Sequence, residues 1–321
     1  MLVAVEGHAL LGSFGQGHRE LLLAIEEKKA LSRSDAEAPS FLPNTDTAGL
    51  SRFFSPRALR QIDHFTRMAL LGTSLALQGL EPVARTGIIL ASGYGLAGPT
   101  FAFMDSVLQY GEDMVSPLAF SHSVQNIPTA TIARQLAITG PCLTICQPEA
   151  AFAQALDMAA QWLAQGFADR VVLVAADEQH PLLPQVVGWL YATQEREVVT
   201  HGIGEGCAAF VLCAPGRAGA DLLPTLQVLT RLEDKNHLEK IPFFFSSLVP
   251  YLPDPAAHDA NESVCIGADG YGLVPVAQAL DVALSLALMA EPPSGEEGLA
   301  ACLCVSISDG TAVHARRVHR P

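Results

Sequence analysis

The 321-residue sequence predicts an α/β fold, because apolar runs typical of buried strands alternate with segments of helical periodicity. The clearest unit is a strand over 142–146, a helix over 149–166 and a strand over 170–175. The second of these strands, RVVLVA, is apolar after its first residue and rich in β-branched valine, which is typical of a parallel sheet buried on both faces. No tandem repeat is evident in the sequence, so a repeat architecture is not expected.

The first part of the chain supplies further elements of both kinds. Residues 2–6 are expected to form a strand, and the run TGIILA at 86–91 a buried one. Ser55-Pro56-Arg57 begins a predicted helix in which apolar residues recur at spacings of three and four as far as Ala76. Two more helices are expected, over 99–108 and 126–137.

The second part is less regular. The run CAAFVLC at 207–213 predicts another buried strand, but the periodicity weakens after Leu222. The segments 243–245 and 250–255 are interpreted as loop-like. A helix is expected over 274–289 and a strand over 301–307. His314 and His319, with the neighbouring Arg316, Arg317 and Arg320, are expected in an exposed basic tail.

Composition excludes several classes of function. The net charge is -14 at pH 7, with 19 Lys and Arg against 33 Asp and Glu, so the chain repels phosphate backbones and anionic lipid. We therefore expect neither nucleic acid nor a membrane surface as a partner. No apolar run reaches the length of a membrane span. The seven cysteines are an odd number without disulfide-like spacing, which favours a reduced, cytoplasmic protein.

Two short motifs resemble cofactor or metal sites. Gly93–Gly98 is a GxGxxG string between a strand and a helix, but a dinucleotide site also needs a second strand ending in an acidic residue about 20 positions later. The region of Glu112 and Asp113 is polar and turn-like, so we interpret the motif as a tight glycine turn and expect no cofactor. Cys302 and Cys304 lie in an apolar strand, and we expect core residues there rather than a metal site.

The segment Gly140-Pro141-Cys142-Leu143-Thr144-Ile145-Cys146-Gln147-Pro148-Glu149 resembles a motif of the β-ketoacyl synthases of fatty-acid and polyketide assembly. In that family a Gly-Pro pair precedes a strand, and a nucleophilic Cys begins the next helix. Other segments are similar to family landmarks: 93–98, 116–126, 204–208, 266–272 and 309–311. The resemblance is good over residues 1–213, partial over 262–313 and absent between.

The resemblance implies that the catalytic groups are missing. Glu149 stands at the position of the nucleophilic Cys, Ala268 at that of a catalytic His, and Ser308 where the family often has a Phe near the oxyanion hole. Nothing matches the motif of the other catalytic His. Claisen condensation needs a thiolate and two histidines, so no catalytic residues are expected. Cys146 is expected to be a core residue inside the strand, with its thiolate disfavoured by burial.

The resemblance also implies a fold and a partner. It predicts a thiolase-like fold of two related α/β halves with mixed sheets, with residues 1–215 in the first half and a shortened second half over 216–321. Family members pair across the strand at 142–146, which makes Cys142, Thr144 and Cys146 interface candidates. Candidates for the shared acyl tunnel are Val115, Leu118, Ala119 and Phe120.

The resulting hypothesis is a non-catalytic subunit of the chain-length-factor type. It would pair with a catalytic ketosynthase and meet acyl carrier protein through that complex, in the biosynthesis of polyketides or fatty-acid-like products, polyenes among them. The usual replacement for Cys in such subunits is Gln rather than Glu. Two alternatives stay open: an enzyme with relocated machinery, such as a decarboxylase or acyl transferase using Glu149 or Cys146, and an acyl-binding homodimer without chemistry.

Overall fold

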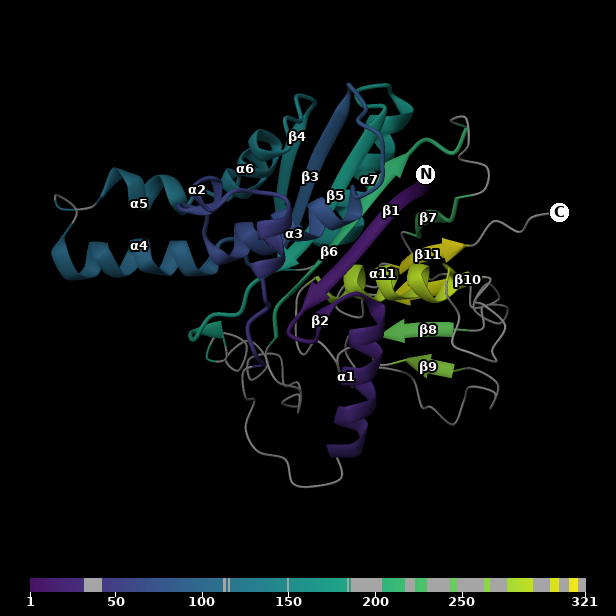
Figure 1. Cartoon of the computed structure of the whole chain (residues 1–321), viewed down its shortest axis with the longest axis horizontal. Helices are drawn as coiled ribbons and strands as arrows, with labels where there is room; N and C mark the ends of the chain where they lie inside the picture. Colours follow the sequence, from purple (N-terminus) through teal and green to yellow (C-terminus); the bar gives the residue numbers. More distant parts are fainter. Residues whose placement is uncertain are drawn as a thin grey trace.

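A mixed β-sheet with helices on both faces organises the molecule (Figure 1). The computed structural model describes residues 1–31, 42–111, 114, 116–148, 150–183, 185, 204–216, 223–229, 243–246, 263–265, 276–290, 301–305 and 312–316. Its strands are β1 (Leu2–Gly12), β2 (Gly15–Gln16), β3 (Thr86–Ser92), β4 (Cys142–Cys146), β5 (Arg170–Asp177), β6 (Gly206–Cys213), β7 (Thr225–Leu229), β8 (Phe243–Ser246), β9 (Ser263–Cys265), β10 (Ala301–Val305) and β11 (Ala312–Arg316).

Strand order and direction repeat in the two ends of the sheet. The path runs β4-β3-β5-β6-β1 and then β7-β11-β10-β8-β9. In the first set β3 is parallel to β4 and β5, and β6 is antiparallel to β5 and β1. In the second set β8 is parallel to β9 and β10, and β11 is antiparallel to β10 and β7. The prediction of two related α/β halves with mixed sheets is therefore confirmed.

The second half is the shorter one in chain length. Residues 230–242 separate β7 from β8, whereas residues 13–85 separate β1 from β3. Similarly, residues 247–262 separate β8 from β9, against residues 93–141 between β3 and β4. The boundary predicted between residues 215 and 216 falls between β6 and β7 and stays a prediction.

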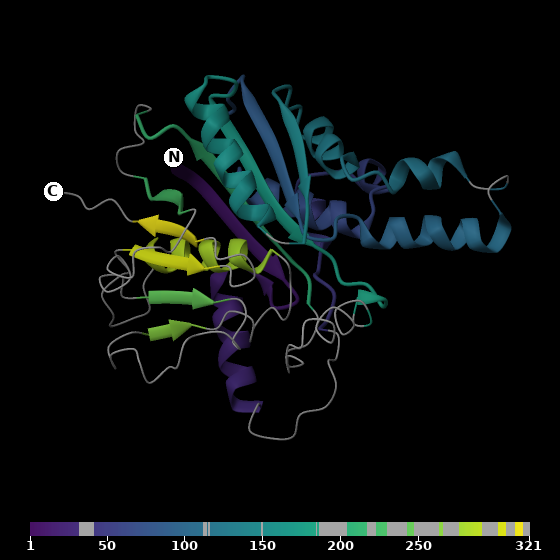
Figure 2. The same cartoon turned by 180° about the vertical axis from the view of Figure 1, so that it is seen from behind.

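The helices cover the two faces of the sheet. They are α1 (His18–Leu31), the 3₁₀ helix η1 (Ala48–Arg52), α2 (Pro56–Leu59), α3 (His64–Ala76), α4 (Ala97–Tyr110), α5 (Pro117–His122), α6 (Ile127–Gln135), α7 (Ala151–Ala164) and α11 (Ala277–Ala290). Figure 2 shows α7 and α11 from behind. No helix in the described part of the chain is long and apolar enough to cross a membrane.

The alternation of side chains along β5 explains how one strand serves both faces. Val171, Leu173 and Ala175 pack in the core that contains α7 and α11. Val172, Val174 and Ala176 point to the other side and pack with α3. Since successive residues of a strand face opposite ways, a strand covered by helices on both sides has to be apolar throughout. This is why RVVLVA could be recognised as a buried strand.

Three sequence predictions about elements are wrong. Residues 243–245 belong to β8, which pairs with β9 and β10, and are not loop-like. His314 and Arg316 lie in β11 rather than in a tail; Val313 and Ala315 are its buried face. The helix expected to begin at Ser55 is two helices, because Asp63 caps a new one: its side chain accepts a hydrogen bond from the Thr66 N–H.

Candidate functional site

The resemblance to the β-ketoacyl synthases places Glu149 at the position of the nucleophilic Cys, in the junction between β4 and α7. β4 pairs with β3 and is the last strand at its end of the sheet path. After β4, the Gln147 N–H donates to the Ser92 carbonyl at 3.0 Å. Ala150, the N-cap of α7, has φ +58°, a left-handed conformation that costs a non-glycine residue roughly 1 kcal/mol. Glu149, between Pro148 and Ala150, lies outside the described residues.

The side chains of β4 are more accessible than the sequence suggested. Cys142 and Cys146 are both exposed, so the expectation that Cys146 is a core residue is wrong; an edge strand leaves one side uncovered. Desolvation by its partial burial, and then the charge of Asp177, nevertheless raise the pKa of the Cys146 thiol. Partial burial also raises the pKa of Cys142. The Thr144 hydroxyl is hydrogen-bonded to that of Thr129 at 2.6 Å, which ties β4 to α6.

Asp177, at the end of β5, is a buried carboxylate that joins separate parts of the fold. Its Oδ1 accepts hydrogen bonds from the Ser92 hydroxyl at 2.6 Å and from the Gly93 and Tyr94 N–H groups at 3.0 Å. A backbone hydrogen bond from Val276, beside the start of α11, also reaches this carboxylate. Burial raises the pKa of Asp177 to about 6, and these hydrogen bonds oppose the rise.

Backbone N–H groups of the glycine turn at 93–98 donate hydrogen bonds to side chains of the same chain. Besides the two N–H groups on Asp177, the Gly98 N–H donates to Glu178 Oε1 at 2.7 Å and the Leu96 N–H to Gln125 Oε1 at 2.9 Å. The Gly95 N–H donates to the Ser92 hydroxyl oxygen. In a dinucleotide site such N–H groups bind pyrophosphate. Here two carboxylates occupy that role, which gives the motif a structural function.

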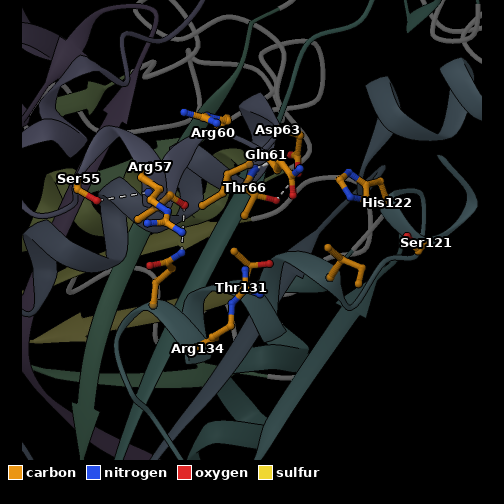
Figure 3. A pocket seen from close by; sticks show the side chains of 14 residues that line it. Ser55, Arg57, Arg60, Gln61, Asp63, Thr66, Ser121, His122, Thr131 and Arg134 are labelled. Atoms are coloured by element: carbon orange, nitrogen blue, oxygen red, sulfur yellow. Dashed lines mark hydrogen bonds between the residues drawn. The ribbon is translucent and has the colours of Figure 1, made fainter. Parts of the chain in front are cut away.

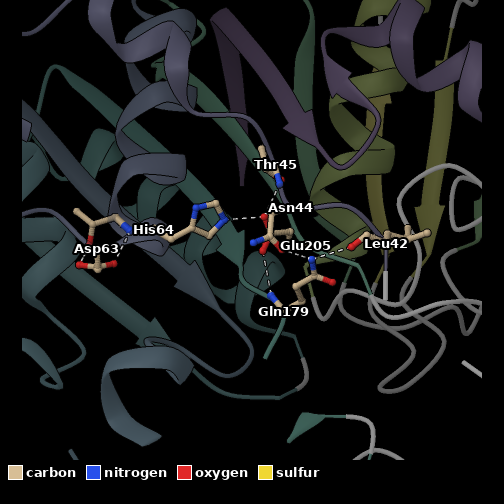
Figure 4. A network of polar contacts seen from close by, with 8 residues as sticks. Leu42, Asn44, Thr45, Asp63, His64, Gln179 and Glu205 are labelled. Carbon is tan, nitrogen blue, oxygen red and sulfur yellow. Dashed lines mark hydrogen bonds and ion pairs between the residues drawn. The ribbon is translucent and has the colours of Figure 1, made fainter. Parts of the chain in front are cut away.

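A second carboxylate network lies beside the first (Figure 4). Glu205 is buried; its Oε1 lies 2.7 Å from His64 Nε2 and accepts a hydrogen bond from the Thr45 N–H at 2.6 Å. The bond to Glu205 raises the pKa of His64. Burial would raise the pKa of Glu205, but the bonds from His64 and Thr45 outweigh it and hold that pKa below its usual value. Burial raises the pKa of the nearby Glu178 to about 7.

Sequence reasoning missed both networks. Asp177 and Glu178 directly follow an apolar strand, and the glycine turn follows β3, its parallel neighbour. Because the carboxyl ends of parallel strands meet at one edge of a sheet, this juxtaposition was a usable signal. Glu205 was recognised only as part of a motif, since His64 is 141 residues away in the chain. No His, Cys, Asp or Glu cluster among the described residues could hold a metal ion.

The tunnel candidates Leu118, Ala119 and Phe120 lie on α5, which forms a helical hairpin with α4 that projects from the body of the protein (Figures 1 and 2). Leu118 and Phe120 are 60% and 56% exposed, and Ala119 is half-buried. The ring of Phe120 packs against that of Phe103 on α4 with centroids 5.5 Å apart. The exposed apolar side chains of this hairpin region are Met104, Leu108, Tyr110, Met114, Leu118 and Phe120.

The candidates fall into three groups. Leu118, Ala119 and Phe120 lie on α5, and Cys142, Thr144 and Cys146 lie on β4; α6 follows the first group in the chain and contacts the strand that carries the second. Val115, Glu149, Ala268 and Ser308 lie outside the described residues. The positions that the structure describes therefore form an exposed edge strand and an exposed hairpin.

Comparison with known proteins gives the family and the fold. The model of the β-ketoacyl synthase N-terminal domain matches residues 34–198. No curated protein matches the sequence. Among solved structures, the chain is similar to the ishigamide ketosynthase/chain length factor, with 18% identity, 99% of each chain covered and a TM-score of 0.70. It also resembles a β-ketoacyl synthase from Burkholderia phymatum STM815, with 14% identity, 99% of each chain covered and a TM-score of 0.66.

A third similar structure is a type II polyketide synthase acyl carrier protein in complex with its ketosynthase bound to the hexaketide. The identity is 17%, the TM-score is 0.70, and 98% of this chain and 99% of that chain are covered. At such identities the likeness establishes the fold alone. The thiolase-like fold predicted from the sequence is therefore confirmed.

Proposed function

Because the chain belongs to the β-ketoacyl synthase family, we propose that it is a non-catalytic subunit of the chain-length-factor type. It pairs with a catalytic ketosynthase in polyketide or fatty-acid-like biosynthesis. The observation that carries the proposal is Glu149, at the position where the family motif has its nucleophilic Cys. A carboxylate could carry an acyl chain only as an unstable anhydride, so Glu149 cannot replace a thiol as the nucleophile.

The nearest thiol is a poor substitute. Cys146 lies three positions before Glu149, on β4 rather than at the start of α7. Nucleophilic catalysis needs the thiolate, and both burial and the charge of Asp177 raise the pKa of Cys146. Ala268 further removes a histidine that condensation would need. These features favour a subunit without condensing chemistry over an enzyme with relocated machinery.

The surface supports a protein partner. Among the described residues no strand pairs with the outer edge of β4, and such an edge can pair with a strand of another chain. Six large apolar side chains of the α4–α5 region are between 49% and 81% exposed. Large exposed apolar side chains that gather on one surface are typical of protein interaction sites. The solved structures described as ketosynthase and chain length factor pairs agree with this assignment at the level of fold.

The finer parts of the proposal follow from the pairing. Val115, Leu118, Ala119 and Phe120 border the acyl tunnel shared with the ketosynthase, and β4 forms the interface through Cys142, Thr144 and Cys146. The acyl carrier protein meets the chain through the complex. A cytoplasmic location fits Cys142, Cys146 and Cys207, none of which forms a disulfide.

Co-expression with candidate ketosynthases tests the pairing. We expect a heterodimer in size-exclusion chromatography with a ketosynthase that has the intact Cys-His-His set. The isolated chain should show no turnover of acyl and malonyl carrier-protein substrates. Turnover above a no-protein control would contradict the proposal. A stable homodimer that forms no complex with any ketosynthase tested would also contradict it.

Two substitutions separate the possible roles. Glu149→Gln keeps the shape and removes the charge, so we expect unchanged pairing and unchanged product formation. Loss of product with pairing intact would instead make Glu149 a base. Bulky replacements at Leu118 and Ala119 should shorten the product; an unchanged product distribution would refute the tunnel assignment. The surface substitution Arg52→Gln, outside both regions, is the control.

A further inference from the structure

A hollow of about 720 Å³ lies between α2, the start of α3, α5 and α6 (Figure 3). Its lining is polar, and it includes three arginines from two separate parts of the chain: Arg57 and Arg60 from α2 and its C-cap, and Arg134 from α6. His122, at the end of α5, also lines the hollow. The hollow contains no residue of β4, and it borders the second carboxylate network through Asp63, which directly precedes His64.

The positive charges of the hollow are not neutralised within the described part of the chain. No described residue forms an ion pair or hydrogen bond with the guanidinium groups of Arg57, Arg60 or Arg134, all of which are exposed. The one carboxylate among the lining residues is Asp63. Both of its oxygens are already engaged, because Oδ1 accepts from the Thr66 N–H and Oδ2 from the Thr66 hydroxyl, each at 2.8 Å.

Three arginines in one hollow are unexpected in a chain of net charge -14. Like charges that line one concave surface create a positive potential there, which attracts anions. The arginines and Asp63 of the lining carry three positive charges and one negative charge, and a dianion would balance this excess. Guanidinium groups bind phosphate oxygens in a fork geometry, and the Thr131 hydroxyl in the lining is a further donor.

We propose that this hollow binds a small phosphorylated ligand whose doubly charged phosphate lies among Arg57, Arg60 and Arg134. Its volume falls in the range of small-molecule sites, about 300–1,000 Å³. The dianionic phosphate distinguishes this ligand class from simple carboxylates, which carry half the charge. The three arginines lie on α2, its C-cap and α6, outside the residues assigned to subunit pairing.

Titration calorimetry of the full-length chain with pyrophosphate, inorganic phosphate and acetate tests the proposal. We expect saturable binding of pyrophosphate and phosphate, and binding of acetate at least tenfold weaker. The double variant Arg57→Gln/Arg134→Gln should weaken pyrophosphate binding by about tenfold or more, because hydrogen bonds to charged groups contribute strongly. Increasing salt should weaken binding of pyrophosphate to the wild type.

Arg52→Gln is the matched control, since it removes the same charge from an exposed arginine outside the hollow. Its affinity for pyrophosphate should stay within twofold of the wild type. Circular dichroism and the unfolding midpoint of each variant establish that the fold is retained. The proposal is overturned if the wild type gives no saturable heat at millimolar pyrophosphate, if acetate binds as tightly as phosphate, or if Arg52→Gln weakens binding as much as the double variant. Failure of ketosynthase pairing would leave it untouched.

Discussion

Asp177 provides a quantitative test of how the two halves of the fold are joined. Replacing it by Ala removes the acceptor for the Ser92 hydroxyl and for the Gly93 and Tyr94 N–H groups, and also for Val276. Water cannot easily take over this role, because Asp177 is only 1% exposed. The variant should therefore lose stability through unpaired buried donors rather than through lost apolar burial.

The size of the loss follows from two opposing contributions. Leaving a buried donor unpaired costs about 1–3 kcal/mol, so the four donors at about 1.5 kcal/mol each give about 6 kcal/mol. Against this, the pKa of Asp177 is raised from 3.8 to about 6, and at about 1.36 kcal/mol per unit the ionised carboxylate costs about 3 kcal/mol. We expect Asp177→Ala to lower the free energy of unfolding by about 3 kcal/mol at pH 8.

The pH dependence has a definite sign. The folded protein holds the proton on Asp177 more tightly than the unfolded chain does, so between pH 3.8 and about 6 the folded state binds more protons and stability falls as pH rises. From pH 5 to pH 8 this carboxyl should remove about 1 kcal/mol from the wild type. The variant lacks that group, so the difference between wild type and variant should be larger at pH 5 than at pH 8.

Urea denaturation at pH 5 and pH 8, followed by circular dichroism, measures both quantities. Asp177→Asn is the matched control, because it keeps one acceptor oxygen and has no titrating proton. It should lose less stability than the Ala variant. Its difference in stability from the wild type should change with pH in the same way as that of the Ala variant. A difference that is independent of pH, or one that grows toward pH 8, would refute the raised pKa. A loss below about 1 kcal/mol for Asp177→Ala would refute the role as a common acceptor.

Two further predictions concern the same edge of the sheet. Gly95→Ala should lower the free energy of unfolding by about 2–3 kcal/mol, because Gly95 has φ +67° and an added Cβ would displace Gln125 Oε1 from its hydrogen bond with the Leu96 N–H. Gly79→Ala, with φ +81° and open space, should lower it by only about 1 kcal/mol in the same urea assay, and equal losses would exclude the displacement of Gln125 as the cause. His64→Ala should destabilise the protein most below pH 6.5, because the hydrogen bond with Glu205 raises the pKa of His64 and the charged imidazolium contributes its full stabilisation there. The effect should diminish as the pH rises through the pKa of His64 in the folded protein. Thermal unfolding at pH 6 and pH 9 measures this, and a larger effect at pH 9 would contradict it.

Local patterns in the sequence predicted the first half of the fold well. β4 was predicted with its observed bounds, and β3 and β5 to within two residues, because strands buried on both faces have an unbroken apolar sequence. β8 and β9 were missed because they are short, and their pairing depends on β10, which lies far along the chain. No local periodicity records such a dependence.

The candidate site was only partly predictable for the same reason. The exposure of Cys146 depends on whether β4 is central or at the edge, which is decided by the order of all strands. Asp177 takes its donors from residues about 85 positions earlier and from Val276, about 100 positions later, so no window of sequence contains the network. The assignment of Glu149 to the nucleophile position, by contrast, rests on a one-residue difference within a local motif of the sequence, and it stays a prediction.

The two thiols at the ends of β4 have a consequence for the homodimer alternative. If two copies paired antiparallel through this edge, centred on Thr144, Cys142 of each copy would lie opposite Cys146 of the other. Directly opposed residues of antiparallel strands have Cα atoms about 4.5–5.5 Å apart, which is within the range of a disulfide. Mild oxidation would then lock a self-paired chain into a covalent dimer visible on a non-reducing gel. A ketosynthase partner with other residues on its strand would prevent this crosslink. Formation of the disulfide would therefore distinguish a homodimer from a heterodimer.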